Sequence, residues 1–255
     1  MPKPVAQPKP KFNVRIALRV SLWLLVLASV AVAATEVRSF IVNDARFRFE
    51  KLEIRGTVYT SRTRIQSIFA PDFNRSVFQI TLAERRRHVL AIDWVRTASV
   101  MRVWPNRIVV SVAERQPVAF AKLPIPGTMR HWLSLVDNEG ILLSIPPKAR
   151  FSLPVLSGIT EDQSDDERKL RVDAMMHLMA DLGPQAKDIS EVNAASEQDM
   201  RVIADVDGQA VELWLGDQRY RSRYLNFLSH YPDIRKREER ANVFDLRLDD
   251  RITTR

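Results

Sequence analysis

The strongest pattern in the sequence is an apolar run near its start, from Ile16 to Ala34, in which Arg19 is the only charged residue. At a rise of ~1.5 Å per residue, a helix over this run reaches roughly the ~30 Å of a hydrocarbon core. Arg19 lies one turn from the beginning of the run, where its long side chain can reach the head groups. We predict a transmembrane helix over residues 16–35, with Arg19 and Trp23 as membrane-anchoring residues.

The charges on either side of this run predict its orientation. Before Glu36 there is no acidic residue, and the basic residues are Lys3, Lys9, Lys11, Arg15 and Arg19. Positive flanks stay on the cytoplasmic side, so residues 1–15 are predicted to be a cytoplasmic tail. A cleaved signal peptide is the alternative, because Ala31-Val32-Ala33 resembles a small-residue cleavage site. In both cases the rest of the chain leaves the cytoplasm.

A charged linker (36–46) precedes a region whose elements follow the order strand, helix, helix, strand, strand. The first strand closes at Gly56, and Thr81 with Glu84 forms a capping box for the second helix. The predicted elements are a strand over 49–54, helices Ser61–Phe69 and Leu82–Ala91, and strands Val95–Arg102 and Arg107–Ala113. This order predicts a small α+β domain over residues 47–116, with one sheet and both helices on one face.

The second region, residues 117–255, alternates in the manner of strands and is predicted to be mainly antiparallel β with flanking helices. Its predicted strands are Val118–Leu123, Trp132–Val136, Ile141–Ile145, Met200–Val206, Ala210–Leu215 and Asn242–Leu248. One helix begins after the cap Ser164, turns Leu170 and Leu178 to one face, and ends at Gly183-Pro184. A second helix is predicted over Asp217–Ser229.

The composition narrows the classes of protein to which this chain can belong. The chain is 45% hydrophobic and 27% charged, which is typical of a globular protein. Without the five positive charges of the leader, the net charge of +8 falls to +3, so nucleic-acid binding is not predicted. The absence of cysteine suits an exported chain, because an oxidising compartment penalises unpaired thiols.

Candidate chemistry is sparse. The four histidines are scattered, the seven glycines form no phosphate-binding loop, and the acidic pairs Asp165-Asp166 and Asp249-Asp250 suit capping and solvation. The basic run Arg85-Arg86-Arg87 is expected mostly to face solvent. No catalytic residue, cofactor or metal site is predicted, and an enzyme is the weaker hypothesis.

A set of motifs beginning at residue 92 resembles the FtsQ/DivIB family of bacterial cell-division proteins. The motifs are Trp94-Val95 with Ala98, Val100 and Arg102; Trp104-Pro105; Glu114-Arg115-Gln116-Pro117-Val118-Ala119; Leu135-Val136-Asp137-Asn138-Glu139-Gly140; Leu153-Pro154-Val155-Leu156-Ser157-Gly158; Leu215-Gly216-Asp217 with Arg223; and Phe244-Asp245-Leu246-Arg247. Together they span nearly all of the chain after the apolar run.

The resemblance implies a bitopic inner-membrane protein with a POTRA (polypeptide-transport-associated) domain next to the membrane and a β domain beyond it. It further implies a non-catalytic scaffold at the division septum, which joins early division proteins to FtsB and FtsL and so to septal peptidoglycan synthesis. The anchor is then expected to stay uncleaved. The alternative function is a POTRA docking module of protein export or outer-membrane assembly.

On this basis, a partner is expected to add a strand to the last strand of the β domain. The candidate residues that form or border this surface are Tyr220, Arg223, Tyr224, Phe244, Leu246, Arg247 and Leu248, and the alternative is that the apolar ones are core. Arg62, Arg64 and Arg102 are weaker candidates for contacts of the POTRA domain. Some family members carry a longer C-terminal tail than this sequence, which leaves contacts of such a tail open.

Overall fold

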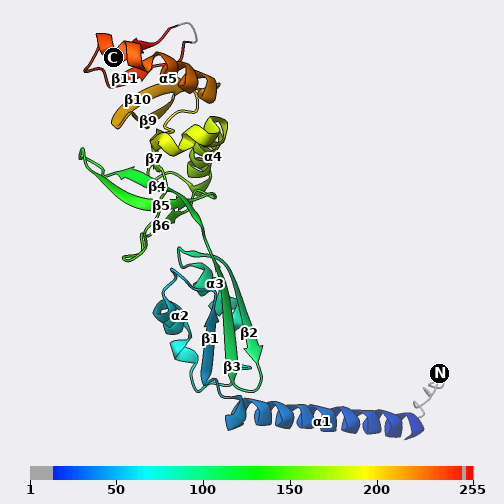
Figure 1. The fold of residues 1–255 in the computed structure, drawn as a ribbon. Coiled ribbons are helices and arrows are strands. Elements are labelled where there is room, and N and C mark those ends of the chain that lie inside the picture. Colours follow the sequence, from blue (N-terminus) through cyan, green and yellow to red (C-terminus); the bar gives the residue numbers. More distant parts are fainter. Residues whose placement is uncertain (1–13, 249–250, 255) are drawn as a thin grey trace, which may run out of the picture. The chain divides into compact units, whose positions relative to one another are not determined.

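The computed structural model describes residues 14–248 and 251–254 (Figure 1). The chain divides into two compact units, the first comprising residues up to Arg55, Thr63–Arg87 and Ser99–Ser111. The second comprises Gly56–Arg62, His88–Ala98 and the chain from Val112 onward. Most of the predicted cytoplasmic tail and the pair Asp249-Asp250 lie outside the described residues.

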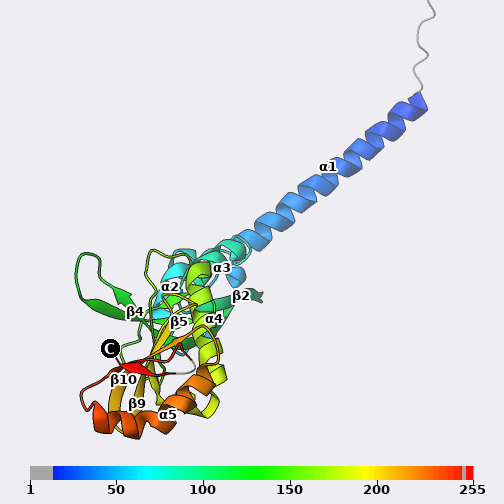
Figure 2. The same ribbon diagram turned by 90° about the horizontal axis from the view of Figure 1, so that it is seen from above.

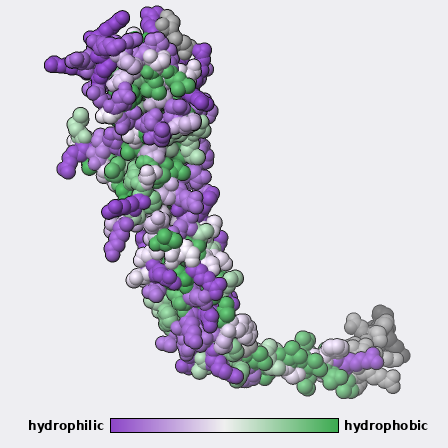
Figure 3. All heavy atoms as spheres, in the orientation of Figure 1, coloured by the Kyte–Doolittle hydropathy of each residue, from purple (hydrophilic) through white to green (hydrophobic). Residues whose placement is uncertain are grey.

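The N-terminal element is the helix α1, Val14–Asn43. It contains an apolar stretch, Leu18–Phe40, that is long enough to cross a membrane, and its side chains are not buried in the protein (Figure 3). The helix extends beyond the predicted span, because the sequence from Thr35 to Asn43 contains no proline or glycine. Most of the predicted linker is therefore helical, and the helix is followed by a short 3₁₀ turn, η1, Ala45–Phe47.

The predicted strand-helix-helix-strand-strand order of the small domain is confirmed. Its elements are β1 (Lys51–Arg55), α2 (Arg62–Phe69), a 3₁₀ turn η2 (Ala70–Asp72), α3 (Leu82–Leu90), β2 (Val95–Val103) and β3 (Arg107–Glu114). The sheet order is β1-β3-β2, and β1 runs parallel to β3. This arrangement leaves one side of β2 as a sheet edge.

Aromatic packing and one buried ion pair organise the first unit. The ring of Phe49 stacks on Phe73 at a centroid distance of 4.6 Å and meets Phe69 edge-on at 6.4 Å. The carboxylate of Asp72, 1% exposed, accepts two hydrogen bonds from the guanidinium of Arg85, at 2.6 and 3.0 Å. Arg86 and Arg87 are exposed, as expected for most of this basic run, whereas Arg85 departs from the expectation because its side chain neutralises a buried acid.

Glu114, at the end of β3, fixes the loop after β1. Its carboxylate accepts hydrogen bonds from the backbone N–H groups of Val58, Tyr59 and Thr60, at distances of 2.9, 3.0 and 2.6 Å. Burial of the Glu114 carboxyl raises its pKa, but these hydrogen bonds outweigh burial and hold the pKa below its usual value.

The larger domain is a nine-stranded sheet in the order β12-β11-β10-β9-β8-β7-β4-β5-β6. The strands are β4 (Pro117–Pro124), β5 (His131–Asp137), β6 (Leu142–Leu143), β7 (Val155–Ser157), β8 (Ile189–Asn193), β9 (Met200–Val206), β10 (Gln209–Gly216), β11 (Val243–Asp245) and β12 (Thr253–Thr254). Most pairs are antiparallel, as predicted, while β4–β7, β7–β8 and β10–β11 are parallel. The sequence reading did not predict β7, β8 or β12.

Two helices, α4 (Asp165–Leu182) and α5 (Tyr220–Arg237), pack against one face of this sheet (Figure 2). The predicted capping box of α4 is present at Ser164, and a 3₁₀ turn, η3 (Gly183–Asp188), follows the helix. Leu170 is 57% exposed, so its assignment to the buried face was wrong. Arg168 is buried instead, because its guanidinium donates to the carbonyl of Gly140 at 2.8 Å and to the carbonyls of Glu161 and Gln163.

Candidate partner-binding surface

The predicted partner-binding residues lie around one end of the nine-stranded sheet. There β11 pairs with β10 in parallel and with the two-residue strand β12 in antiparallel register, Phe244 opposite Thr254 and Asp245 opposite Thr253. No further strand pairs with β12 among the described residues. The last strand of the sheet is therefore β12, and the predicted strand Asn242–Leu248 is reduced to Val243–Asp245.

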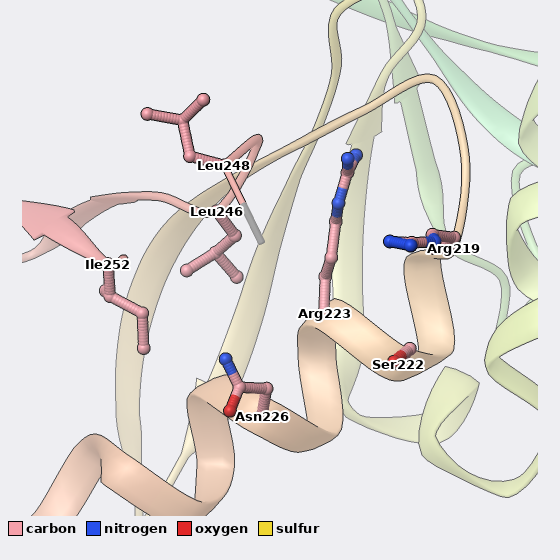
Figure 4. Close-up of a pocket in the computed structure, with 7 residues that line it drawn as sticks. All are labelled: Arg219, Ser222, Arg223, Asn226, Leu246, Leu248 and Ile252. Carbon is pink, nitrogen blue, oxygen red and sulfur yellow. The ribbon is translucent and has the colours of Figure 1, made fainter. Parts of the chain in front are cut away.

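A pocket of about 220 Å³ opens beside this edge, between the first turns of α5 and the chain that follows β11 (Figure 4). Three of the predicted residues line it, namely Arg223, Leu246 and Leu248. The other lining residues are Arg219, Ser222, Asn226 and Ile252. Leu248 is 54% exposed, whereas Leu246 is 3% exposed. The pocket thus combines an apolar wall from the C-terminal segment with a polar wall from α5.

Gly216 allows two arginines to converge next to the pocket. Its φ of +76° lies in the left-handed region that favours glycine. A Cβ atom at this position would lie 2.9 Å from Nη1 of Arg223 and 3.3 Å from Cγ of Arg247. Because that space is free, Nη1 of Arg223 donates a hydrogen bond of 2.6 Å to the carbonyl oxygen of Leu215, the last residue but one of β10.

Arg247 belongs to a network on the sheet face opposite the helices. Its guanidinium donates to both carboxylate oxygens of Asp245, at 2.8 and 2.6 Å, and to Asp199 at 3.3 Å. The hydrogen bonds that Arg247 donates to Asp245 raise the pKa of Arg247 above its usual value. The guanidinium carbon also lies 5.0 Å from the ring centre of Trp214, and that of Arg201 lies 3.8 Å from the same ring.

Sequence reasoning did not select Trp214, Arg201 or Asp199. A usable signal was present, because β10 alternates between buried Leu213 and Leu215 and the less buried Glu212 and Trp214. This alternation assigns Trp214 to the outer face of the sheet.

The other predicted residues lie beneath the surface. Tyr220, Tyr224 and Phe244 belong to the core between α5 and the sheet, with exposed fractions of 4%, 0% and 0%. The Tyr220 hydroxyl donates to the carbonyl of Asp217 at 2.9 Å, while burial raises the pKa of Tyr224 to about 12. In this structure these side chains support the pocket from below, and Arg223, Arg247 and Leu248 are the predicted residues that remain accessible.

The candidate residues of the POTRA domain do not form one group. Arg62 and Arg64 are exposed on α2. Arg102, on the edge strand β2, donates hydrogen bonds of 2.6 Å to the carbonyl oxygens of Val77 and Ile80. Arg102 thus holds the loop before α3, and its guanidinium is engaged within the domain.

Comparison with known proteins identifies the family. The family profile described as "POTRA domain, FtsQ-type" matches residues 47–115. The chain is 32% identical to the cell division protein FtsQ of Koribacter versatilis, over 98% of this chain and 72% of that protein. This chain belongs to the FtsQ family. It is also 27% identical to FtsQ of Novosphingobium aromaticivorans, over 92% of this chain and 69% of that protein.

Family membership gives the elements described above a context. The three-stranded domain is a POTRA domain of the FtsQ type, and the nine-stranded sheet is the β domain that follows it. With its apolar helix α1, the chain is a membrane-anchored division protein. Among the described residues, no group of three or more His, Asp or Glu side chains is placed to hold a metal ion.

Proposed function

We propose that this chain is a non-enzymatic scaffold of the division machinery, which captures a partner segment by strand addition at the β12 edge. The partners are division proteins of the FtsB and FtsL type, through which the scaffold connects early division proteins to septal peptidoglycan synthesis. Residues 1–15 lie in the cytoplasm, residues 16–35 span the inner membrane, and both folded domains lie in the periplasm at the septum.

One observation carries the strand-addition proposal, namely a sheet edge next to a pocket that has one apolar and one polar wall. An edge strand presents backbone N–H and C=O groups, which supply sequence-independent hydrogen bonds to an added strand. The pocket lined by Leu246, Leu248 and Ile252 lies beside that edge and accepts a side chain of the incoming segment. Backbone pairing then sets the register of the segment, and side-chain contacts in and around the pocket supply the rest of the binding energy and the selection.

We propose further that the POTRA domain contacts other division proteins through α2 and the edge of β2. Arg62 and Arg64 supply exposed cationic groups on α2, and β2 supplies a second, separate strand edge. The alternative of an export or outer-membrane assembly module is not favoured, because the relatives that match most of the chain are FtsQ proteins.

Two measurements test the proposal. A fluorescent protein fused to the N-terminus, away from the β12 edge, is expected to collect at midcell in dividing cells. In the same strain, FtsB- and FtsL-type proteins are expected to co-purify with the full-length chain, and amide exchange at Thr253 and Thr254 is expected to slow when they bind. Uniform membrane fluorescence contradicts the division role, whereas binding without protection of these amides contradicts the strand-addition mode.

A further inference from the structure

Trp104 is an exposed aromatic residue at the tip of the β2–β3 hairpin. It lies in the turn between β2 and β3 and is 68% exposed, compared with 3% for Trp94 and 40% for Trp132. Val103 and Met101, which precede it on β2, are 39% and 50% exposed. Trp104 thus belongs to a group of three exposed apolar side chains at the hairpin tip, and a clustered apolar surface of this kind suits contact with something outside the domain.

The indole of Trp104 is held in place by two phenylalanines. Its ring centre lies 5.6 Å from that of Phe47 and 5.2 Å from that of Phe78, in both cases edge-on. Phe47 belongs to η1 and is the fourth residue after Asn43, where α1 ends. Since a chain extends at most ~3.6 Å per residue, Phe47 lies within about 15 Å of the end of the membrane helix.

The sequence around the end of α1 keeps this region close to the membrane. The candidate span reaches Phe40, and the apolar residues Ile41 and Val42 continue beyond it. Hydrocarbon and head groups together are about 40 to 45 Å thick, so the head-group layer adds several Å on each side of the core. Phe47, which contacts Trp104, is thus tethered within about 15 Å of the end of α1, and this distance allows the tip to reach the head-group layer.

The chemistry of the tip suits that layer. Tryptophan concentrates at membrane interfaces, because its ring is apolar while its indole N–H can bond to water or a head group. Exposed Arg48 follows Phe47, and guanidinium groups bind phosphate well, whereas the guanidinium of Arg46 is paired with the carboxylate of Asp44. We propose that the β2–β3 tip of the POTRA domain inserts Trp104 into the head-group layer of the membrane that α1 spans, and so restricts the orientation of this domain.

The test uses the full-length chain in vesicles of phosphatidylcholine and phosphatidylglycerol that contain lipids brominated close to the head group. Trp23→Phe first removes the tryptophan of the membrane helix. In this background the bromolipid is expected to quench part of the fluorescence. Trp104→Phe is expected to abolish that quenching, whereas the control Trp132→Phe retains it. Equal quenching with and without Trp104, or no quenching in the parent, would overturn the proposal.

A second measurement guards against altered packing of the tip in the Trp104→Phe variant. The sequence contains no cysteine, so Val103→Cys and Met129→Cys each introduce a unique attachment point for a spin label. Met129 serves as the control because it is 96% exposed in the larger domain. In vesicles, the label at residue 103 is expected to be relaxed more by membrane-dissolved oxygen than by a water-soluble nickel chelate, and the label at residue 129 is expected to show the opposite preference. Equal behaviour of both labels contradicts membrane contact. No partner protein is present, so the result does not depend on the proposed scaffold function.

Discussion

Replacing Leu248 tests whether the pocket beside β12 selects the partner. Full burial of a leucine contributes ~1.5 to 3 kcal/mol, and Leu248 is still 54% exposed. A partner that covers the exposed half therefore gains about 1 kcal/mol, and Leu248→Ala should weaken binding about fivefold. Leu248→Lys should weaken it by roughly a hundredfold or more, because the added cation is desolvated without an opposite charge. Lysine is preferred to glutamate, since Arg219 and Arg223 line the pocket and could pair with a carboxylate.

The assay is binding of the FtsB- and FtsL-type pair to the purified full-length chain, measured by titration together with thermal unfolding. Because Leu248 is half exposed, its loss should lower the midpoint by no more than about 2 to 4 °C. Leu170→Lys is the matched control, since Leu170 is 57% exposed on α4 and does not line the pocket. Unfolding of the Leu248→Lys variant would show that Leu248 is a core residue. Unchanged affinity in a folded Leu248→Lys variant would remove the pocket from the binding surface.

Three further predictions concern the supports of the two domains. Gly216→Ala should destabilise the chain by the ~1 to 2 kcal/mol that a left-handed conformation costs a residue with a side chain. Its Cβ would also lie 2.9 Å from Nη1 of Arg223 and displace that flexible side chain, so the hydrogen bond from Arg223 to the carbonyl of Leu215 is lost as well. Gly208→Ala has the same type of φ, +79°, and open space around it, so equal losses in urea unfolding for both variants would contradict the collision argument. Glu114→Gln should remove a stabilisation that is fully present above the carboxyl's ordinary pKa of 4.5 and is lost as the pH falls through the lowered pKa of the folded state. The thermal midpoints of parent and variant should therefore converge as the pH falls below 4.5 and through the lowered pKa of the folded state, and a constant difference would exclude Glu114 as the titrating group. Asp72→Ala should cost up to about 3 kcal/mol in chemical unfolding, since it leaves the guanidinium of Arg85, which is 15% exposed, with only a 3.9 Å ion pair to Glu84. A loss that is not partly recovered by adding Arg85→Met would argue against the Asp72–Arg85 pair as the cause.

The elements predicted correctly are those with strong local signals. The capping box at Ser164 and the stop at Gly183 fix α4 from the sequence alone. The helix α5 continues to Arg237 although Pro232 suggests an earlier end, because its aromatic residues pack on the sheet and outweigh the local cost of proline. The strands β7 and β12 contain only three and two residues, too few to show a period of two. They exist because neighbouring strands supply their hydrogen bonds.

The sequence predicted where the candidate surface lies, but not which of its side chains are buried and which are exposed. Local sequence placed Phe244, Leu246 and Leu248 on the last strand, yet alternation ends at Asp245, where β11 itself ends. Burial of Phe244 and exposure of Leu248 depend on how the chain turns after β11, which is a long-range property. For Trp104, no local pattern indicates that the indole stays exposed while Phe47 and Phe78 hold it.

The shortness of β12 has a consequence for unwanted partners. A net backbone hydrogen bond contributes only ~0.5 to 1.5 kcal/mol, so pairing along two residues yields about 1 to 3 kcal/mol. Millimolar affinity already requires about 4 kcal/mol. A misfolded or unrelated extended chain therefore gains too little from this edge to remain attached, even in a crowded compartment. The edge thus discriminates between partners and unrelated chains by dissociation rate as well as by affinity. Unrelated chains dissociate quickly, and only segments whose side chains also fit stay bound.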